Sequence, residues 1–315
     1  KIALSPPSHA GTAPPGAVED RSAPRDGILR ASEEIALQSA SFQAERLTGV
    51  LGAEISGVDL TRPITAELEK KIRESLLEHQ VLFFRDQDLN PEQHKRVGGC
   101  FGELHVHPVL PSRKDEGHPE IITIHADDKS KVVAGMKWHS DVSCDLEPPM
   151  GSILRIEQVP SSGGDTLFAN MCAAYEKMPP QLRDEIAGRR ARHSFPYSRT
   201  LQNLPPMDEA EAAQVPPVEH PLVRRHPDGR VSLYVSATYM ECVVGLADAA
   251  GRQLLEELMA WATQDCFTYR HRWRPDDVLM WDNRWMIHVV EPFDHGVERR
   301  AKHRTTIAGT GPVDG

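Results

Sequence analysis

The alternation of apolar and polar residues predicts mainly β structure from about residue 81 to the end of the chain. Short apolar runs recur there between glycine, proline and aspartate residues, which is typical of short buried strands. Asp228 and Gly229 mark the turn of a predicted hairpin within "HPLVRRHPDGRVSLYV". The other predicted strands are "VLFFRDQ", "EIITIHA", "GSILRIEQV", "DTLFANM", "CFTYRHRWR", "DVLMWDN" and "RTTIAG".

A few helices interrupt the strands. The apolar positions of "TAELEKKIRESLLEH" follow the helical period, and Thr65 is suited to cap this helix. "NPEQHKRVGGCFGEL" predicts a second capped helix, and we expect two more at about 171–187 and 247–264. Many short strands with a few peripheral helices favour a mainly β sandwich or barrel over a doubly wound parallel sheet.

The first 42 residues have a different texture. They are rich in proline, alanine, serine and glycine and cannot bury enough apolar surface to offset the entropy of ordering. We therefore expect an N-terminal extension or arm over residues 1–42 and a single domain over residues 43–315. Residues 127–137 and the proline-rich residues 201–217 are expected to be loops that could close over a binding site.

Composition narrows the classes of partner. The formal net charge of −10 disfavours nucleic acid and anionic membranes. No run approaches the roughly 18 apolar residues that a membrane span needs, so we expect a soluble protein. The five cysteines are scattered and form no CxxC pair, which suits reduced thiols in the cytoplasm better than disulfides or a structural zinc site.

"WHSD" places His139 and Asp141 two residues apart, so that on a strand both side chains point to one face. Such a pair alone is more often a surface turn than a metal site. A third ligand far along the chain would change this, because two histidines and one carboxylate leave three metal positions open. His288, in "DVLMWDNRWMIHVVEP", is the candidate, and a satisfied core histidine is the alternative for a chain with 15 histidines.

Arg300 and Arg304 follow four residues apart in "ERRAKHRTTIAG". A strand interior is a costly place for arginine unless it meets an anion, and the planar guanidinium matches a carboxylate in bidentate fashion. The pair implies an organic acid as cosubstrate. The alternative is a solvated basic strand at the edge of a sheet.

Taken together and in order, these motifs resemble the family of Fe(II)/2-oxoglutarate enzymes that contains taurine dioxygenase and 2,4-dichlorophenoxyacetate dioxygenase. The resemblance covers about residues 44–311. The motifs that carry it are "GVLGAEISGVDLTRPI", "HQVLFFRDQDL", "FGELHVHPV", "WHSD", "GGDTLFAN", "WDNRWMIH" and "RRAKHRTTIAG".

The resemblance implies a double-stranded β-helix (jelly-roll) with peripheral helices, and an oxygenase that uses Fe(II), 2-oxoglutarate and O2. His139, Asp141 and His288 would hold the iron. Thr166 and Arg300 would bind the distal carboxylate of 2-oxoglutarate. Hydroxylation of a substrate carbon next to a heteroatom would accompany the release of succinate and CO2.

Four further residues are expected around the substrate and cosubstrate, two of them by their match to family positions. His107 and Arg304 match positions that bind the anionic group of the substrate, although the second arginine serves 2-oxoglutarate in other branches. Val142 and Tyr239 are assigned to the pocket for the substrate body. Together they imply a small anionic substrate: an alkyl or aryl sulfonate, a sulfate ester, or a carboxylate such as an aryloxyalkanoate.

The chain departs from the taurine-specific pattern at two positions. Leu110 and Gly135 stand where relatives that act on taurine have polar partners for its ammonium group, and a buried ammonium without partners is strongly disfavoured. We therefore expect taurine to be a poor substrate. Cys144, next to the metal motif, is expected to be a buried filler, because no base accompanies it at a defined spacing.

Two other functions fit parts of the same pattern. One is a zinc-dependent hydrolase that uses the two histidines and the aspartate, and the other is a jelly-roll binding protein without catalysis. The complete ligand set together with Arg300 argues against the second. Because members of the family commonly form dimers or tetramers, the resemblance also implies a homo-oligomer of one of these two kinds.

Overall fold

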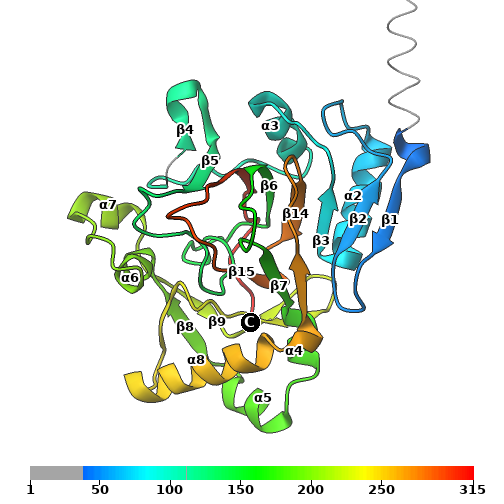
Figure 1. The fold of residues 1–315 in the computed structure, drawn as a ribbon. Coiled ribbons are helices and arrows are strands. Elements are labelled where there is room, and N and C mark those ends of the chain that lie inside the picture. The colour runs from blue at the N-terminus through cyan, green and yellow to red at the C-terminus, as the bar shows by residue number, and fades with distance from the viewer. Residues whose placement is uncertain (1–37, 111) are drawn as a thin grey trace, which may run out of the picture.

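The structure, a computed structural model, describes residues 38–110 and 112–315 and is built on one large sheet (Figure 1). Neighbouring strands are antiparallel except β2 and β3, which are parallel. In spatial order the strands are β1 (Gln43–Arg46), β2 (Ala53–Ser56), β3 (Val81–Phe84), β14 (Val278–Asp282), β6 (Gly151–Gln158), β16 (Arg300–Ile307), β5 (His118–Ala126) and β4 (Ser112–Arg113).

Three smaller sheets complete the β structure. A three-stranded antiparallel sheet shares a core with the inner face of the large sheet, and the two form the expected double-stranded β-helix. The predicted hairpin is confirmed, with Gly229 at a positive φ of 88° in its turn. The strands are β13 (Thr268–His271), β7 (Thr166–Asn170) and β15 (Met286–Val290); β12 (Met240–Val243), β8 (Arg190–His193) and β9 (Val218–Pro221); and the hairpin β10 (Val223–Arg225) and β11 (Val231–Leu233).

Two predicted helices cover the outer face of the large sheet. Helix α2 spans Ala66–His79, and the Thr65 hydroxyl caps it by accepting a hydrogen bond from the Leu68 amide at 3.1 Å. Helix α3 spans Pro91–Gly99 and begins with a capping box at Asn90. The caps confirm both predictions, because they satisfy amides that the first helical turn leaves free.

The helix expected at about 171–187 is wrong in one respect: it is two short helices, α4 (Met171–Glu176) and α5 (Pro180–Ile186). Pro179 lies between them with φ −54° and ψ 138°, outside the helical region. Because Pro180 clashes with a helical conformation of the residue before it, the helix cannot run through this point. The helix expected at about 247–264 is confirmed as α8 (Asp248–Ala262).

The proline-rich residues 201–217 were expected to be a loop, and this is also corrected. They contain the end of α6 (Phe195–Leu201) and all of α7 (Glu209–Gln214), whose first turn is capped by Asp208. Residues 127–137 are irregular, as expected. Two short 3-10 turns lie at η1 (Lys114–Glu116) and η2 (Asp265–Phe267).

Most of the predicted N-terminal arm, residues 1–37, lies outside the described residues. Of the helices that the structure describes, none has both the length and the apolar character needed to cross a bilayer.

The strands of the large sheet alternate between two cores. On β14, Leu279 and Trp281 point inward and pack with Phe168 of β7 between the two facing sheets. Val278 and Met280 point outward and pack under α2 and α3. Because side chains alternate along a strand, a continuous apolar run is what a central strand buried on both faces requires.

Gly151 lies at the start of β6, where this strand pairs with both β14 and β16. A Cβ at this position would stand 2.6 Å from the Trp281 carbonyl oxygen. We expect Gly151→Ala to lower the free energy of unfolding by about 1–3 kcal/mol, since overpacking forces the backbone to shift. Urea denaturation measures this quantity.

Gly99 supplies the matched control, because a Cβ there meets no atom within 4 Å outside its own helix. Gly99→Ala is expected to leave the stability unchanged or to raise it by up to about 1 kcal/mol, as alanine favours the helix. Equal effects of the two substitutions would contradict the close packing at Gly151.

Candidate metal centre and active site

His139 and His288 are joined directly through their backbones in an isolated antiparallel bridge. The His139 amide donates to the His288 carbonyl at 3.0 Å, and the His288 amide donates back at 2.8 Å. The Oδ1 atom of Asp141 lies 3.8 Å from the Nε2 atom of each imidazole. One ligand atom from each of the three residues lies within 4.8 Å of the others, so the structure brings the predicted triad together.

Hydrogen bonds on the far side of two ligands fix which atoms face the centre. His139 Nδ1 donates to the Lys137 carbonyl at 2.7 Å, which leaves the Nε2 lone pair free. The Ser152 hydroxyl donates to Asp141 Oδ2 at 2.8 Å, which leaves Oδ1. Two imidazole nitrogens and one carboxylate oxygen, oriented in this way, fit an Fe(II) ion that keeps open positions for cosubstrate and oxygen.

The charge states also suit a metal. Burial lowers the pKa of His139 and of His288, so both imidazoles stay neutral and can act as ligands. Burial alone would raise the pKa of Asp141, but the charge of the Arg304 guanidinium and the hydrogen bond from Ser152 hold it below its ordinary value. Arg304 forms an ion pair with Asp141 Oδ1, the same oxygen that faces both histidines.

Thr166 and Arg300 are in contact with each other and form a second group of polar side chains, apart from the three metal ligands. The Thr166 hydroxyl accepts hydrogen bonds from the Trp273 indole at 3.0 Å and from the Arg300 guanidinium at 3.4 Å. A hydroxyl has two acceptor positions and one proton, so the Thr166 proton remains available to an added acceptor. Arg300 is 3% exposed, and burial lowers its pKa to about 10. These groups fit a carboxylate.

His107 presents a single donor. Its Nδ1 atom accepts from the amides of Val109 and Leu110 at 3.2 and 3.1 Å, so the proton is on Nε2. This buried Nε2 has no hydrogen-bond partner among the residues that the structure describes. Burial lowers the pKa of His107 to about 4, which keeps the ring neutral.

Apolar side chains adjoin His107. Its ring lies 5.2 Å from that of Phe195, which stacks on Tyr239 at 6.5 Å. Val142 and Cys144 are buried in the same cluster. The structure therefore brings the predicted substrate residues His107, Val142 and Tyr239 to one region, and burial raises the pKa of the Cys144 thiol, as expected of a filler.

Two backbone conformations next to the ligands are unusual. Val142 has a φ of 49°, in the left-handed region, where a β-branched side chain costs about 1–3 kcal/mol. Gly135 has a φ of 88°, and a Cβ there would lie 3.5 Å from His139 Cε1. A side chain at position 135 would thus stand beside the metal ligand. Leu110 packs on the cluster that contains Val142.

The comparisons with known proteins agree with this geometry. A model of the family described as "Taurine catabolism dioxygenase TauD, TfdA family" matches residues 43–306. The chain belongs to the TauD/TfdA family of dioxygenases.

Individual relatives span nearly the whole of the match. The alpha-ketoglutarate-dependent 2,4-dichlorophenoxyacetate dioxygenase of Cupriavidus pinatubonensis is 36% identical, over 85% of this chain and 98% of that protein. The alkylsulfatase of Acinetobacter baylyi is 33% identical, over 85% of each chain. The crystal structure of a taurine dioxygenase from Burkholderia xenovorans has a TM-score of 0.72 and 37% identity, over 86% of this chain and 91% of that one.

Membership of the family confirms the expected fold, reaction class and cofactors. The protein is an oxygenase that depends on Fe(II), 2-oxoglutarate and O2, and His139, Asp141 and His288 form its metal site. The relatives support the assignment as a dioxygenase. They give no support to a zinc-dependent hydrolase or to a binding protein without catalysis.

Sequence reasoning missed several residues of the dioxygenase site. Ser152 orients Asp141, and Trp273 donates to Thr166. Lys302 shares the inner face of β16 with the two arginines. Strand alternation alone would have placed Lys302 with Arg300 and Arg304, but the partners of Ser152 and Trp273 are distant in sequence.

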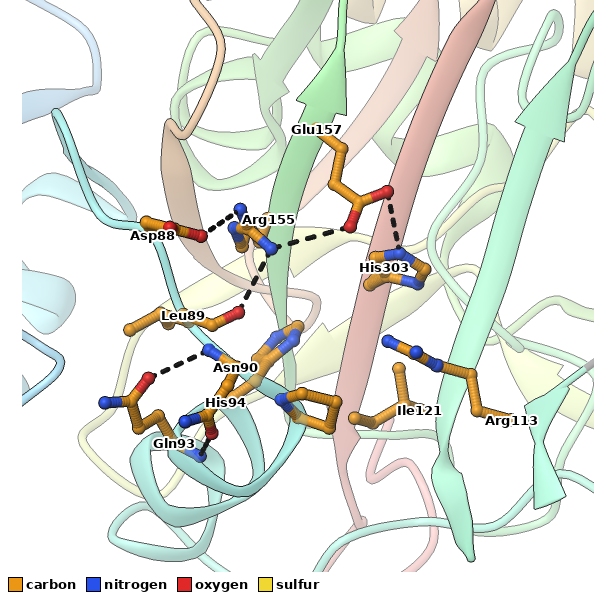
Figure 2. A pocket seen from close by; sticks show the side chains of 11 residues that line it. Asp88, Leu89, Asn90, Gln93, His94, Arg113, Ile121, Arg155, Glu157 and His303 are labelled. Carbon is orange, nitrogen blue, oxygen red and sulfur yellow. Dashed lines mark hydrogen bonds and ion pairs between the residues drawn. The ribbon is translucent and has the colours of Figure 1, made fainter. Parts of the chain in front are cut away.

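A polar cavity of about 430 Å³ lies on the opposite face of the large sheet. Figure 2 shows the side chains that line it. His303 points to that face because it alternates with the inward arginines of β16. The charges there satisfy one another: Arg155 pairs with Asp88 and Asp276 at 2.6 Å, and His303 lies 3.2 Å from Glu157. This cavity is separate from the metal centre.

Ser152→Ala should weaken metal binding while the three ligands stay in place. Removing the hydroxyl leaves Asp141 Oδ2 without its donor, and loss of such a partner typically costs about 10- to 100-fold in metal affinity. Titration of the metal-free enzyme with Mn(II), followed by electron paramagnetic resonance, measures the effect.

Ser198→Ala is the control, because this buried hydroxyl donates to the Phe195 carbonyl and not to Asp141. It should leave the Mn(II) affinity unchanged. If both variants bind Mn(II) as the parent enzyme does, the Ser152 hydroxyl does not orient the ligand.

Proposed function

We propose that this dioxygenase hydroxylates a small substrate that joins one anionic group to an apolar body, at a carbon next to a heteroatom. The observation that carries the proposal is the buried, unpartnered Nε2–H of His107, whose ring adjoins Phe195 of the apolar cluster that includes Val142 and Tyr239. A buried donor without a partner is costly, so an anionic acceptor would repay it. The candidate groups are a sulfonate, a sulfate ester or an aryloxy carboxylate.

The residue roles follow from the contacts. His139, Asp141 and His288 would hold Fe(II), which with 2-oxoglutarate and O2 supplies the hydroxylation and yields succinate and CO2. Arg300 would receive the distal carboxylate of 2-oxoglutarate in bidentate fashion, and the Thr166 hydroxyl would add its proton. Trp273 keeps Thr166 oriented by occupying one of its acceptor positions.

Arg304 is proposed to serve the anionic group of the substrate. Its Nη1 atom pairs with Asp141, whereas its buried Nε has no hydrogen-bond partner in the described part of the chain. Its charge also acts on His107, which supports a shared role of the two donors in binding one anion. An anion bound between them would hold a carbon of the attached body next to the iron ligands.

The body of the substrate is proposed to be apolar and not an amine. Leu110 packs on the Val142 cluster, and Gly135 offers no side chain beside His139. An ammonium in this region would find no acceptor at either position, and burying it would be costly. The relatives named for 2,4-dichlorophenoxyacetate and for alkyl sulfates have substrates of the expected kind.

The proposal extends to the domain organisation, the oligomeric state and the location of the enzyme. Residues 43–315 would form one domain, since β1 and β16 belong to the same sheet, with residues 1–42 as an arm. Residues 127–137, which lead into His139, would close over the bound substrate. We place the enzyme in the cytoplasm as a homo-oligomer, and light scattering of the full chain distinguishes a dimer from a tetramer.

Succinate release should depend on O2, Fe(II) and an added substrate of the proposed class. In a screen of alkyl sulfates, aryl and alkyl sulfonates and aryloxy acids, we expect the best compound to exceed taurine in kcat/KM by at least about 10-fold, because taurine carries an unmatched ammonium. His139→Ala should abolish both Mn(II) binding and succinate release. Taurine as the best substrate would refute the apolar body.

Thr166→Val should raise KM for 2-oxoglutarate by about 10-fold or more and change kcat little, because the lost hydrogen bond is made to a charged carboxylate in the ground state. Thr305→Val is the matched control. Its hydroxyl is buried on the outer face of β16, near Gly98, without a partner among the described residues. A similar KM in both variants would show that Thr166 does not contact the cosubstrate.

A further inference from the structure

Strand β16 directs three cations, not two, toward the metal centre. Arg300, Lys302 and Arg304 alternate along the strand and are all buried, so their side chains share its inner face. The two arginines have partners in Thr166 and Asp141. Lys302 is 7% exposed, and its side chain makes no hydrogen bond or ion pair with the residues that the structure describes.

The surroundings offer Lys302 no free anion. Asp141 is the one acidic group that acts on it, and the charges of Arg300 and Arg304 oppose its protonation, as burial does. Both Asp141 oxygens are already engaged, one by Arg304 and the other by Ser152. The charged form of Lys302 in this position would need an anion that the chain itself does not provide.

The three cations face different parts of the site. Arg300 contacts Thr166, at the end proposed for the distal carboxylate of 2-oxoglutarate. Arg304 acts on His107, on the side proposed for the substrate. Lys302 stands between them on the inner face of β16, the face from which Arg304 reaches the iron ligand Asp141.

We propose that Lys302 binds the carboxylate of 2-oxoglutarate that lies at the metal, while Arg300 and Thr166 bind the distal one. The inference rests on the function proposed above for Arg300. Two residues of a strand span about 6.8 Å, which places Lys302 one step from Arg300 toward the metal end. A dianionic cosubstrate laid along β16 would thus meet a cation at each of its carboxylates.

The test compares two ligands that differ only at the distal end. 2-Oxopentanoate keeps the first carboxylate and the oxo group of 2-oxoglutarate but has no distal carboxylate. Each is titrated calorimetrically, without O2, into the Mn(II)-loaded enzyme and its Lys302→Met variant. We expect Lys302→Met to weaken both ligands by a similar factor of about 10 or more, since each loses the same charge-assisted contact.

Control variants separate this inference from the proposed function. Arg300→Met should weaken 2-oxoglutarate and leave 2-oxopentanoate unchanged; if it does not, the placement of the distal carboxylate is wrong whatever Lys302 does. His303→Gln changes the neighbouring residue on the outer face of the same strand and should affect neither ligand. Lys302→Arg, which keeps the charge, should bind both ligands more tightly than Lys302→Met.

Two results would overturn the role of Lys302. One is a loss of affinity in Lys302→Met for 2-oxoglutarate alone, which would assign the ammonium to the distal carboxylate. The other is unchanged affinity for both ligands. Thermal unfolding of the metal-free proteins adds a separate readout: Lys302→Met should melt at a higher temperature than the parent, because an unpaired buried ammonium is removed. A lower melting temperature with unchanged ligand affinity would indicate a structural residue only.

Discussion

The buried carboxylate of Asp141 is the anion on which the interior of this dioxygenase depends. It lies within 3.8 Å of both imidazole ligands and pairs with Arg304, and its other oxygen is held by Ser152. A charge so deep in a protein is stable only when it is paired and hydrogen-bonded. Asp141 is the one acidic group whose charge acts on Lys302, and it is already paired with Arg304, so a charged Lys302 would need an anionic ligand. A metal ion bound to Asp141 would free the guanidinium and make this need greater.

Strand alternation explains how one sheet performs two tasks. On β16, the inner residues carry the cations of the site, whereas His303 on the outer face joins the paired charges of the second cavity. The same period gives β14 one apolar face for each core. Rigid central strands are a suitable base for such a site, because ligands and cosubstrate must be held within fractions of an ångström.

The proposed substrate preference depends on two polar side chains that are absent, at positions 110 and 135, and on the donor of His107 that is present. Gly135 has no side chain that could place a polar group beside His139, and Leu110 adds apolar surface to the Val142 cluster. His107 keeps a neutral ring with one unpartnered donor, which favours an anionic or strongly polar oxygen over a cation. Under the proposed function, the family chemistry would be combined with a pocket that selects by charge at one end and by apolar contact at the other.

The sequence by itself determined most strands and the caps of α2 and α3, because these depend on local periodicity and capping residues. It identified the metal ligands only through the ordered set of motifs that resembles the family, since the His139–Asp141 pair and His288 each have a common structural alternative. It misjudged the break at Pro179 and the helix α7, whose signals are only a few residues long. Only the tertiary structure decided that Ser152 orients Asp141, that Trp273 holds Thr166, and that Lys302 has no partner. Those facts depend on atoms brought together from distant strands, and no local pattern records such distances.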